Sequence, residues 1–393
     1  MPATFDFTSI QDRLAWSASK WEKYRGREVI PLWVADMDFA APPAVQAALA
    51  RHVAHGNYGY MDAPRELAAQ LAADYQRRYA WAIEPEWIVW LPGLVIGLNL
   101  AVKTCCTPGA AAICFSPIYP PFLAAPKAQG CTLVDVPLQP LNAAETEFVI
   151  DFPALEAALR ATPDSRLLLL SHPHNPIGRL FSRTELEQLA DFCVRHDLYV
   201  CSDEIHADLI LDGQTPHLPF GKLLGEYAPE LLPRCITLHS PSKTYNIAGL
   251  TIAWAVIPDP GLRRGFRKAM HKLVPEPCSF GFTALQAILA DGDAWRQALL
   301  AQLRENRDKV SAALQRMGLA HTHPEVTYLS WIDARALAAR VGNPARWFEE
   351  HGAGLSDGTD FGRPGFLRLN FALPPLLLDE ALARMEHAIA SLG

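Results

Sequence analysis

The sequence predicts an α/β protein with a mostly parallel sheet flanked by helices and a second, smaller α+β part. Between about residues 88 and 257, short apolar runs alternate with helical patterns, as in parallel sheets covered by helices. After about residue 285, Ala- and Leu-rich helical segments dominate. A chain of 393 residues is also long enough to form more than one core. We therefore predict a large domain over 46–285 and a discontinuous small domain over 1–45 and 286–393.

The strands are predicted from short apolar runs. Several of these runs are continuously apolar, which is typical of strands buried on both faces. In the large domain the predicted strands are Ile88–Leu91, Ala111–Phe115, Thr132–Val136, Arg166–Ser171, Leu198–Ser202, Cys235–His239 and Thr251–Ile257. In the smaller part they are Val326–Ile332 and Gly365–Phe371.

One helix start is marked by a capping box. In Ser182-Arg183-Thr184-Glu185, the serine and glutamate side chains can bind free amides of the first turn. Apolar residues then recur at the spacing of one buried helical face. These residues are Leu186, Leu189, Ala190, Cys193 and Val194. A second apolar helix is expected to begin after Gly93.

Composition and charge exclude several classes of protein. The formal net charge is -7 and Lys and Arg are not clustered, which argues against nucleic acid as a partner. The longest apolar stretch, 88–102, contains Pro92 and Gly93 and is shorter than the roughly 20 residues of a membrane span. The N-terminus lacks the pattern of a signal peptide. We expect a cytoplasmic protein without a membrane span.

The eight cysteines are expected to be free thiols. No Cys-x-x-Cys pair occurs, and most of the cysteines lie in apolar segments. His172 and His174 alternate without a carboxylate or cysteine partner, which falls short of a zinc site. We predict no bound metal.

Polar residues follow several predicted strands. In open α/β sheets, ligands bind beyond the carboxyl ends of the strands, so these residues are expected to meet in one crevice. They are Tyr119, Asn175, Asp203, His206 and Lys243.

Lys243 has the surroundings of a nucleophile. A lysine is most often a solvated surface residue. This one follows an apolar strand and lies between small hydroxyl residues and the turn Ala248-Gly249-Leu250. Partial desolvation lowers the pKa of a lysine and favours the neutral amine, which can attack a carbonyl.

Four motifs in order along the chain resemble the class I and II aminotransferase family of fold type I pyridoxal-phosphate enzymes. The resemblance covers essentially the whole chain. The motifs are His172-Pro173-His174-Asn175-Pro176-Ile177-Gly178, Asp203-Glu204-Ile205-His206, Ser240-Pro241-Ser242-Lys243 and Phe366-Leu367-Arg368-Leu369-Asn370. The implied cofactor is pyridoxal 5'-phosphate, bound to Lys243 as a Schiff base.

The resemblance assigns roles around the cofactor ring. Asp203 would keep the pyridine nitrogen protonated, which makes the ring a better electron sink. Asn175 would bind the phenolic oxygen, His206 would lie near that oxygen, and Tyr119 would stack on the ring. Lys243, Asp203 and Tyr119 are thus the expected catalytic residues. The alternatives are a turn-capping Asp203, an Asn175 that only shapes a turn, and a Tyr119 that only packs in a loop.

The cofactor phosphate is expected at Gly93-Leu94-Val95, where a helix begins and free amides favour an anion. Ser240 and Ser242 would add hydroxyl groups. Tyr60 resembles the tyrosine that reaches the phosphate from a neighbouring subunit, which implies a homodimer.

The expected partner is a small-molecule amino-acid substrate. Arg368 resembles the arginine that binds the substrate carboxylate through its two-pronged guanidinium group, with an exposed arginine on a strand as the alternative. Ala35, Asp36 and Asn175 are the other predicted substrate contacts.

Departures from the common pattern resemble the cystathionine β-lyase or cysteine C-S lyase branch. Thr251 stands where many aminotransferases carry a phosphate-binding arginine, and His206 replaces a tyrosine. The segments 31–39 and 327–335 also resemble this branch. The implied reaction is β-elimination from cystathionine or another S-substituted L-cysteine, with Lys243 as general base, to give thiol, pyruvate and ammonia.

The sequence leaves three other functions as alternatives. An aminotransferase would use the same residues, because fold and site do not separate the two reactions. A regulatory or binding protein on the same scaffold is a more remote alternative. Ser240-x-x-Lys243 also fits the Ser-x-x-Lys pattern of β-lactamase-type acyl transfer, but Ser-Asp-Asn and Lys-Thr-Gly are missing.

Overall fold

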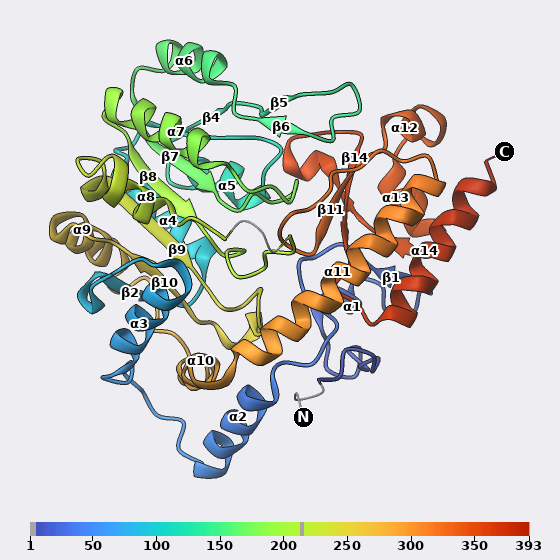
Figure 1. The fold of residues 1–393 in the computed structure, drawn as a ribbon, viewed down its shortest axis with the longest axis horizontal. Coiled ribbons are helices and arrows are strands. Elements are labelled where there is room, and N and C mark those ends of the chain that lie inside the picture. The colour runs from blue at the N-terminus through green and yellow to red at the C-terminus, as the bar shows by residue number, and fades with distance from the viewer. Residues whose placement is uncertain (1–4, 213–215, 393) are drawn as a thin grey trace.

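A computed structural model describes residues 5–212 and 216–392 and shows a seven-stranded sheet with a separate C-terminal part (Figure 1). The ends of the predicted small domain, residues 1–4 and 393, lie outside the described residues. The large sheet contains β2 (Ile88–Leu91), β3 (Ala111–Cys114), β4 (Thr132–Asp135), β7 (Ser165–Ser171), β8 (Tyr199–Asp203), β9 (Cys235–His239) and β10 (Ala253–Val256). All seven strands were predicted from the sequence, with ends that differ by up to two residues.

The order of the large sheet is β2-β10-β9-β8-β7-β3-β4. Strands β9, β8, β7, β3 and β4 pair in parallel, and β10 is antiparallel to both of its neighbours. The sheet is therefore mostly parallel, as predicted. Strand β10 starts two residues later than expected, because Ala248–Leu250 form a 3-10 turn and Thr251 has a left-handed φ of 49°.

Helices cover both faces of this sheet. In β7, Leu167 and Leu169 pack into one buried cluster with α4, while Leu168 and Leu170 pack into another with α7. This alternation explains why the strand sequence is continuously apolar. The helices of this part of the chain are α2 (Pro43–His55), α3 (Leu67–Tyr79), α4 (Leu94–Cys105), α5 (Pro120–Ala128), α6 (Phe152–Ala161), α7 (Arg183–Arg195), α8 (Phe220–Tyr227), α9 (Pro260–Met270) and α10 (Ser279–Asp291).

The C-terminal part is a three-stranded antiparallel sheet with helices, reached through the long α11 (Asp293–Arg316) (Figure 1). Its sheet has the order β11-β14-β13. The remaining elements here are β11 (Leu329–Asp333), β13 (Ser356–Asp357), β14 (Phe366–Asn370), α12 (Arg335–Val341), α13 (Pro344–Glu350) and α14 (Pro375–Ala390). Strand β11 begins three residues later than predicted, because Thr327 has a φ of 77° and interrupts the extended backbone.

The N-terminal segment crosses to the C-terminal part. It carries α1 (Ser19–Glu22) and β1 (Ile30–Pro31), which pairs in parallel with β12 (Ala353–Gly354). A small hairpin, β5 (Gln139–Pro140) and β6 (Phe148–Val149), completes the strands of the described residues.

The capping box predicted at α7 is present. The Glu185 amide donates to the Ser182 hydroxyl oxygen at 3.3 Å, and the Ser182 amide donates to the Glu185 carboxylate at 2.9 Å. The predicted apolar face is buried at Leu186, Leu189, Ala190 and Cys193, whereas Val194 is only partly buried and Phe192 is buried instead.

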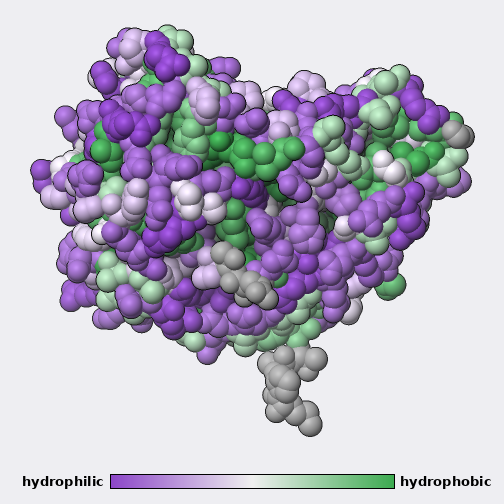
Figure 2. Space-filling view, turned by 45° about the horizontal axis from the view of Figure 1, so that its top comes forward, coloured by the Kyte–Doolittle hydropathy of each residue, from purple (hydrophilic) through white to green (hydrophobic). Residues whose placement is uncertain are grey.

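The prediction of free cysteines is confirmed, with six of the thiols buried, Cys105 partly buried and Cys278 exposed. None of the described helices combines the length and apolar character needed to cross a membrane. Polar residues cover most of the face in Figure 2, and apolar residues show in the hollow between the two parts of the molecule.

Replacing Ser182 with alanine is expected to destabilise the protein by about 1 kcal/mol, because the first turn of α7 loses its cap. Urea unfolding followed by circular dichroism would measure the change. Thr184→Ala, at an exposed position in the same turn, is the control and should change stability by less than about 0.5 kcal/mol. Equal effects of the two substitutions would contradict a stabilising cap.

Candidate active site

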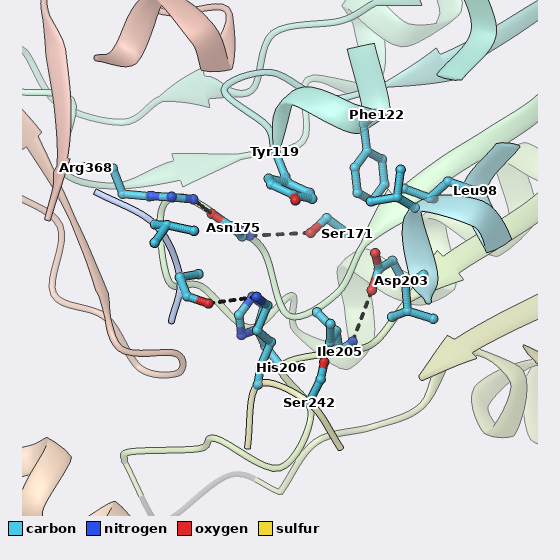
Figure 3. Close-up of a pocket in the computed structure, with 15 residues that line it drawn as sticks. Leu98, Tyr119, Phe122, Ser171, Asn175, Asp203, Ile205, His206, Ser242 and Arg368 are labelled. Atoms are coloured by element: carbon cyan, nitrogen blue, oxygen red, sulfur yellow. Dashed lines mark hydrogen bonds between the residues drawn. The ribbon is translucent and has the colours of Figure 1, made fainter. Parts of the chain in front are cut away.

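A pocket lies at the carboxyl ends of the central strands, beside the C-terminal part (Figure 3). Strand β7 contributes Ser171, β8 contributes Asp203, and the loop after β9 contributes Lys243. Strand β14 of the other sheet contributes Arg368. The pocket thus forms where parallel strands end, as expected for a ligand site in an α/β sheet.

Ten of the residues predicted from the sequence line this pocket. They come from seven separate stretches of the chain, which only the fold brings together. They are Ala35, Leu94, Val95, Tyr119, Asn175, Asp203, His206, Ser242, Lys243 and Arg368.

Four predicted residues lie outside this lining. Gly93 is the N-cap of α4, directly before two lining residues. The Ser240 hydroxyl donates to the Ile252 carbonyl at 2.7 Å, so it holds the loop before Lys243. The Asp36 carboxylate forms an ion pair with Arg13. Tyr60 is fully exposed on this chain. The ligand contacts predicted for these four residues stay predictions.

The shape of the pocket suits a flat ring. In Figure 3, Tyr119 lies on one side of the space and Ile205 on the other, while Arg368 and Asp203 lie at opposite ends. A planar group between Tyr119 and Ile205 would therefore face the Asp203 carboxylate at one end and the Arg368 guanidinium at the other. Such a layout separates the partner of a ring nitrogen from the partner of a substrate carboxylate.

Asp203 is a buried carboxyl group. It is 5% exposed, and its Oδ1 accepts the Ile205 amide at 3.1 Å. Burial raises the pKa of Asp203 to about 7, partly opposed by that amide and by Lys243. A cationic ring nitrogen placed against Asp203 would favour its charged form. The side chain therefore fits the role predicted for it.

Arg368 and Asn175 form one unit. Nη1 of Arg368 donates to Oδ1 of Asn175 at 3.1 Å, and Nη2 donates to the Trp33 carbonyl at 2.8 Å. The guanidinium also lies over the Phe361 ring, 4.5 Å from its centre. Because arginine can only donate, the Asn175 oxygen must face it, which leaves the Asn175 Nδ2 group to donate into the pocket. This orientation fits the contact with a phenolic oxygen that is predicted for Asn175.

The start of α4 is suited to an anion. Leu94 and Val95 line the pocket in the first turn of this 12-residue helix, where amides have no intrahelical partner. Ser242, after β9, adds a hydroxyl group to the same pocket. These groups fit a phosphate.

Lys243 and His206 are both held toward their neutral forms. Burial lowers the pKa of the Lys243 amine, and Nζ donates to the Ala35 carbonyl at 2.7 Å. Burial also lowers the pKa of His206 to about 3, with the nearby charges of Lys243 and Arg368 adding to the effect. Nδ1 of His206 is buried without a hydrogen-bond partner among the described residues. A neutral amine beside a neutral imidazole suits attack on an aldehyde.

Several lining residues were missed in the sequence. Ile205 lies inside the motif Asp203-Glu204-Ile205-His206, but its apolar side chain carries no sequence signal for a ligand contact. Leu98 and Phe122 lie one helical turn after Leu94 and Tyr119, so helical spacing could have found them. Ser171, the last residue of β7, carried no such signal.

Comparison with known proteins shows relatives that are similar over nearly the whole chain. Cystathionine beta-lyase PatB of Bacillus subtilis is 32% identical over 395 residues, covering 98% of this chain and all of the relative. Arginine–pyruvate transaminase AruH of Pseudomonas aeruginosa is 32% identical, covering 94% of this chain and 92% of the relative.

Two solved structures share the fold of this chain over nearly its whole length. The crystal structure of OvoB has a TM-score of 0.93 and 40% identity over 99% of this chain and 100% of that chain. Cystalysin from Treponema denticola, which contains pyridoxal 5'-phosphate, has a TM-score of 0.92 and 29% identity over the whole of both chains.

Asp203→Asn is expected to stabilise the cofactor-free protein above neutral pH. The folded pKa of about 7 exceeds the ordinary value of 3.8, so the stability linked to protonated Asp203 is lost as pH rises through 7. At pH 8 the variant should be more stable by an amount on the order of 2–4 kcal/mol, and near pH 4 the two proteins should be alike.

Thermal unfolding of both cofactor-free proteins between about pH 4 and pH 8 would measure this difference. The cofactor-loaded proteins serve as the control, because the ring nitrogen should reverse the order of stability. Parallel pH profiles of the cofactor-free proteins would show that Asp203 does not titrate in this range.

The polar groups of the pocket fit pyridoxal 5'-phosphate at each end of its ring. Asp203 suits the ring nitrogen, the Asn175 amide suits the phenolic oxygen, and the start of α4 suits the phosphate. The family described as "Aminotransferase class I and II" matches residues 27–385 of the chain. The protein is therefore a pyridoxal 5'-phosphate-dependent enzyme with the type I fold and belongs to the class I and II aminotransferase family, in which cystathionine β-lyases and C-S lyases are similar to it over nearly the whole chain.

Proposed function

We propose that the protein is a C-S lyase that catalyses β-elimination from cystathionine or another S-substituted L-cysteine and, with the uptake of one water molecule, releases a thiol, pyruvate and ammonia. The observation that carries this proposal is the similarity to proteins named cystathionine β-lyase or C-S lyase across nearly the whole chain. Thr251 and His206, which differ from the residues that many aminotransferases carry at these positions, also support a C-S lyase.

The residues of the pocket support the proposed chemistry. Pyridoxal 5'-phosphate, when bound, supplies a ring that accepts the electrons left when the α-proton is removed. Arg368 binds the substrate carboxylate and so fixes the α-carbon relative to Lys243. The lowered pKa of Lys243 favours a neutral amine that can take the α-proton. Tyr119 and Ile205 hold the ring between them.

Transamination is the alternative reaction, and the relative AruH supports it. It would use Lys243, Asp203 and Arg368 in the same way and then pass the amino group to a 2-oxo acid. A purely regulatory protein is disfavoured, because the four groups needed for catalysis, Lys243, Asp203, Asn175 and Arg368, are all present in one pocket.

We also propose a homodimer in which Tyr60 completes the neighbouring phosphate site. Tyr60 is fully exposed and Tyr58 is 59% exposed, although both are large aromatic residues. Val95, 44% exposed, lies at the phosphate end of the pocket itself. A partner subunit covering these residues would bury them and close that end of the site.

Cytoplasmic location and the division into domains at residues 45/46 and 285/286 also remain proposals. The acidic net charge and the reduced cysteines are consistent with the former. Cell fractionation can test the location, and limited proteolysis can test the domain boundaries.

Adding L-cystathionine to the enzyme should release thiol and pyruvate, whereas an amino acid with 2-oxoglutarate should give little glutamate. Lys243→Ala should lower thiol release by a factor of about 1,000 or more, because both the cofactor attachment and the base are lost. Lys309→Ala, at a lysine paired with Asp379 on the surface, is the matched control and should keep full activity. Glutamate without thiol would establish a transaminase instead.

Mixing two inactive variants should restore activity if Tyr60 acts across a dimer. In a heterodimer of Tyr60→Ala and Lys243→Ala chains, one site would have both residues intact. Random exchange should therefore recover about a quarter of the wild-type activity. The measurement is thiol release after subunit exchange, with each variant alone as the control. No recovery, with heterodimers demonstrated by mass spectrometry, would place Tyr60 in its own subunit's site or in none.

A further inference from the structure

Tyr328 lies next to the active-site lysine, in a segment to which the proposed reaction assigns no role. It is 1% exposed, and its hydroxyl donates to the Ala35 carbonyl at 3.1 Å. The same carbonyl oxygen accepts the Lys243 amine at 2.7 Å. Two side chains from distant parts of the chain, residues 243 and 328, therefore meet on one backbone oxygen.

The backbone before Tyr328 is strained. Thr327 is fully buried and has a φ of 77°, which is unfavourable for a β-branched residue. Its amide donates to the Leu209 carbonyl at 3.1 Å, and its Oγ1 accepts the Leu329 amide at 3.1 Å. The surrounding contacts thus hold a conformation that the residue alone disfavours. Strained backbone of this kind is concentrated at functional sites.

The Ala35 carbonyl is itself held in place. Asn370 Nδ2 donates to the carbonyls on either side of it, to Val34 at 2.7 Å and to Asp36 at 2.8 Å. The buried Lys20 amine also donates to the Asp36 carbonyl at 2.8 Å. The acceptor for Lys243 is therefore part of a fixed backbone segment.

We propose that the Ala35 carbonyl and the Tyr328 hydroxyl form a resting site for the free amine of Lys243, and that Tyr328 is a positioning residue for that amine. An amine that donates one N–H group to a fixed carbonyl keeps its lone pair free, because the lone pair cannot point at an acceptor. The lysine would occupy this site whenever it is not bonded to the cofactor. The inference rests on the proposed role of Lys243 as the cofactor-binding lysine and base.

We expect Tyr328 also to influence the pKa of the Lys243 amine through the acceptor that they share. Its O–H group points its hydrogen at the oxygen that Lys243 shares, and a partial positive charge there disfavours the ammonium form. The other charged or titratable groups that face Lys243 are Asp36, Asp203, His206 and Arg368. Removing the hydroxyl while leaving these groups unchanged should raise the pKa of Lys243.

The test is cofactor uptake by the cofactor-free protein, followed by the absorbance of bound pyridoxal 5'-phosphate across pH. In Tyr328→Phe, uptake near neutral pH should be about three- to tenfold slower, the effect of one lost hydrogen bond, and its pH midpoint should move upward. Tyr75→Phe is the matched control. Tyr75 is as deeply buried, and its hydroxyl accepts the Trp254 N–H at 2.8 Å in the core. This variant should lose stability but keep the wild-type midpoint.

A Tyr328→Phe profile that superimposes on the wild-type profile would overturn the resting site, as would an equal shift in Tyr75→Phe. Lys243→Ala separates this failure from failure of the proposed function. If Lys243→Ala still forms the absorbance band of bound cofactor, Lys243 is not the cofactor lysine. Both the proposed function of Lys243 and the resting site would then be wrong. If it loses the band while Tyr328→Phe behaves as wild type, only the role of Tyr328 falls. Thermal unfolding of each variant verifies that it is folded.

Discussion

The active site depends on a partly buried backbone segment that has no strand partner. Residues 33–37 belong to neither helix nor strand, and apart from the bond between the Asp36 amide and the Val34 carbonyl, their carbonyl groups are bound by side chains. Arg368 binds the Trp33 carbonyl, Asn370 binds those of Val34 and Asp36, and Lys243 and Tyr328 share that of Ala35. The need to satisfy one stretch of backbone thereby places residues from both parts of the molecule around one pocket.

The same segment is anchored on its outer side by charges. Lys20, 1% exposed, forms an ion pair with Asp38 at 2.7 Å, and Arg13 binds Asp36. An ion pair this deeply buried is costly to break, because one charge would be left without a partner. The Ala35 carbonyl is thus fixed from outside as well as from within, which explains how one oxygen can orient two donors.

Burial controls the chemistry of the pocket as strongly as the choice of residues. Asp203, Lys243, His206 and Arg368 are all removed from water, and in each case burial shifts the pKa toward the neutral form. A ligand with a cationic ring nitrogen and an anionic carboxylate would supply the missing opposite charges at Asp203 and Arg368. The pocket therefore offers a carboxyl group at one end and a guanidinium group at the other, each suited to a ligand group of opposite charge.

The sequence by itself determined the strands of the large sheet, the α7 cap and most of the lining residues, because these depend on apolar periodicity and short motifs. It did not determine that β10 runs antiparallel, since an apolar run carries no direction. Only the tertiary structure decided that Asp36 pairs with Arg13, that Ser240 binds Ile252, and that Tyr328 meets Lys243 at Ala35. Those contacts join residues far apart in the chain, and local patterns hold no information on which distant groups will share a hydrogen bond.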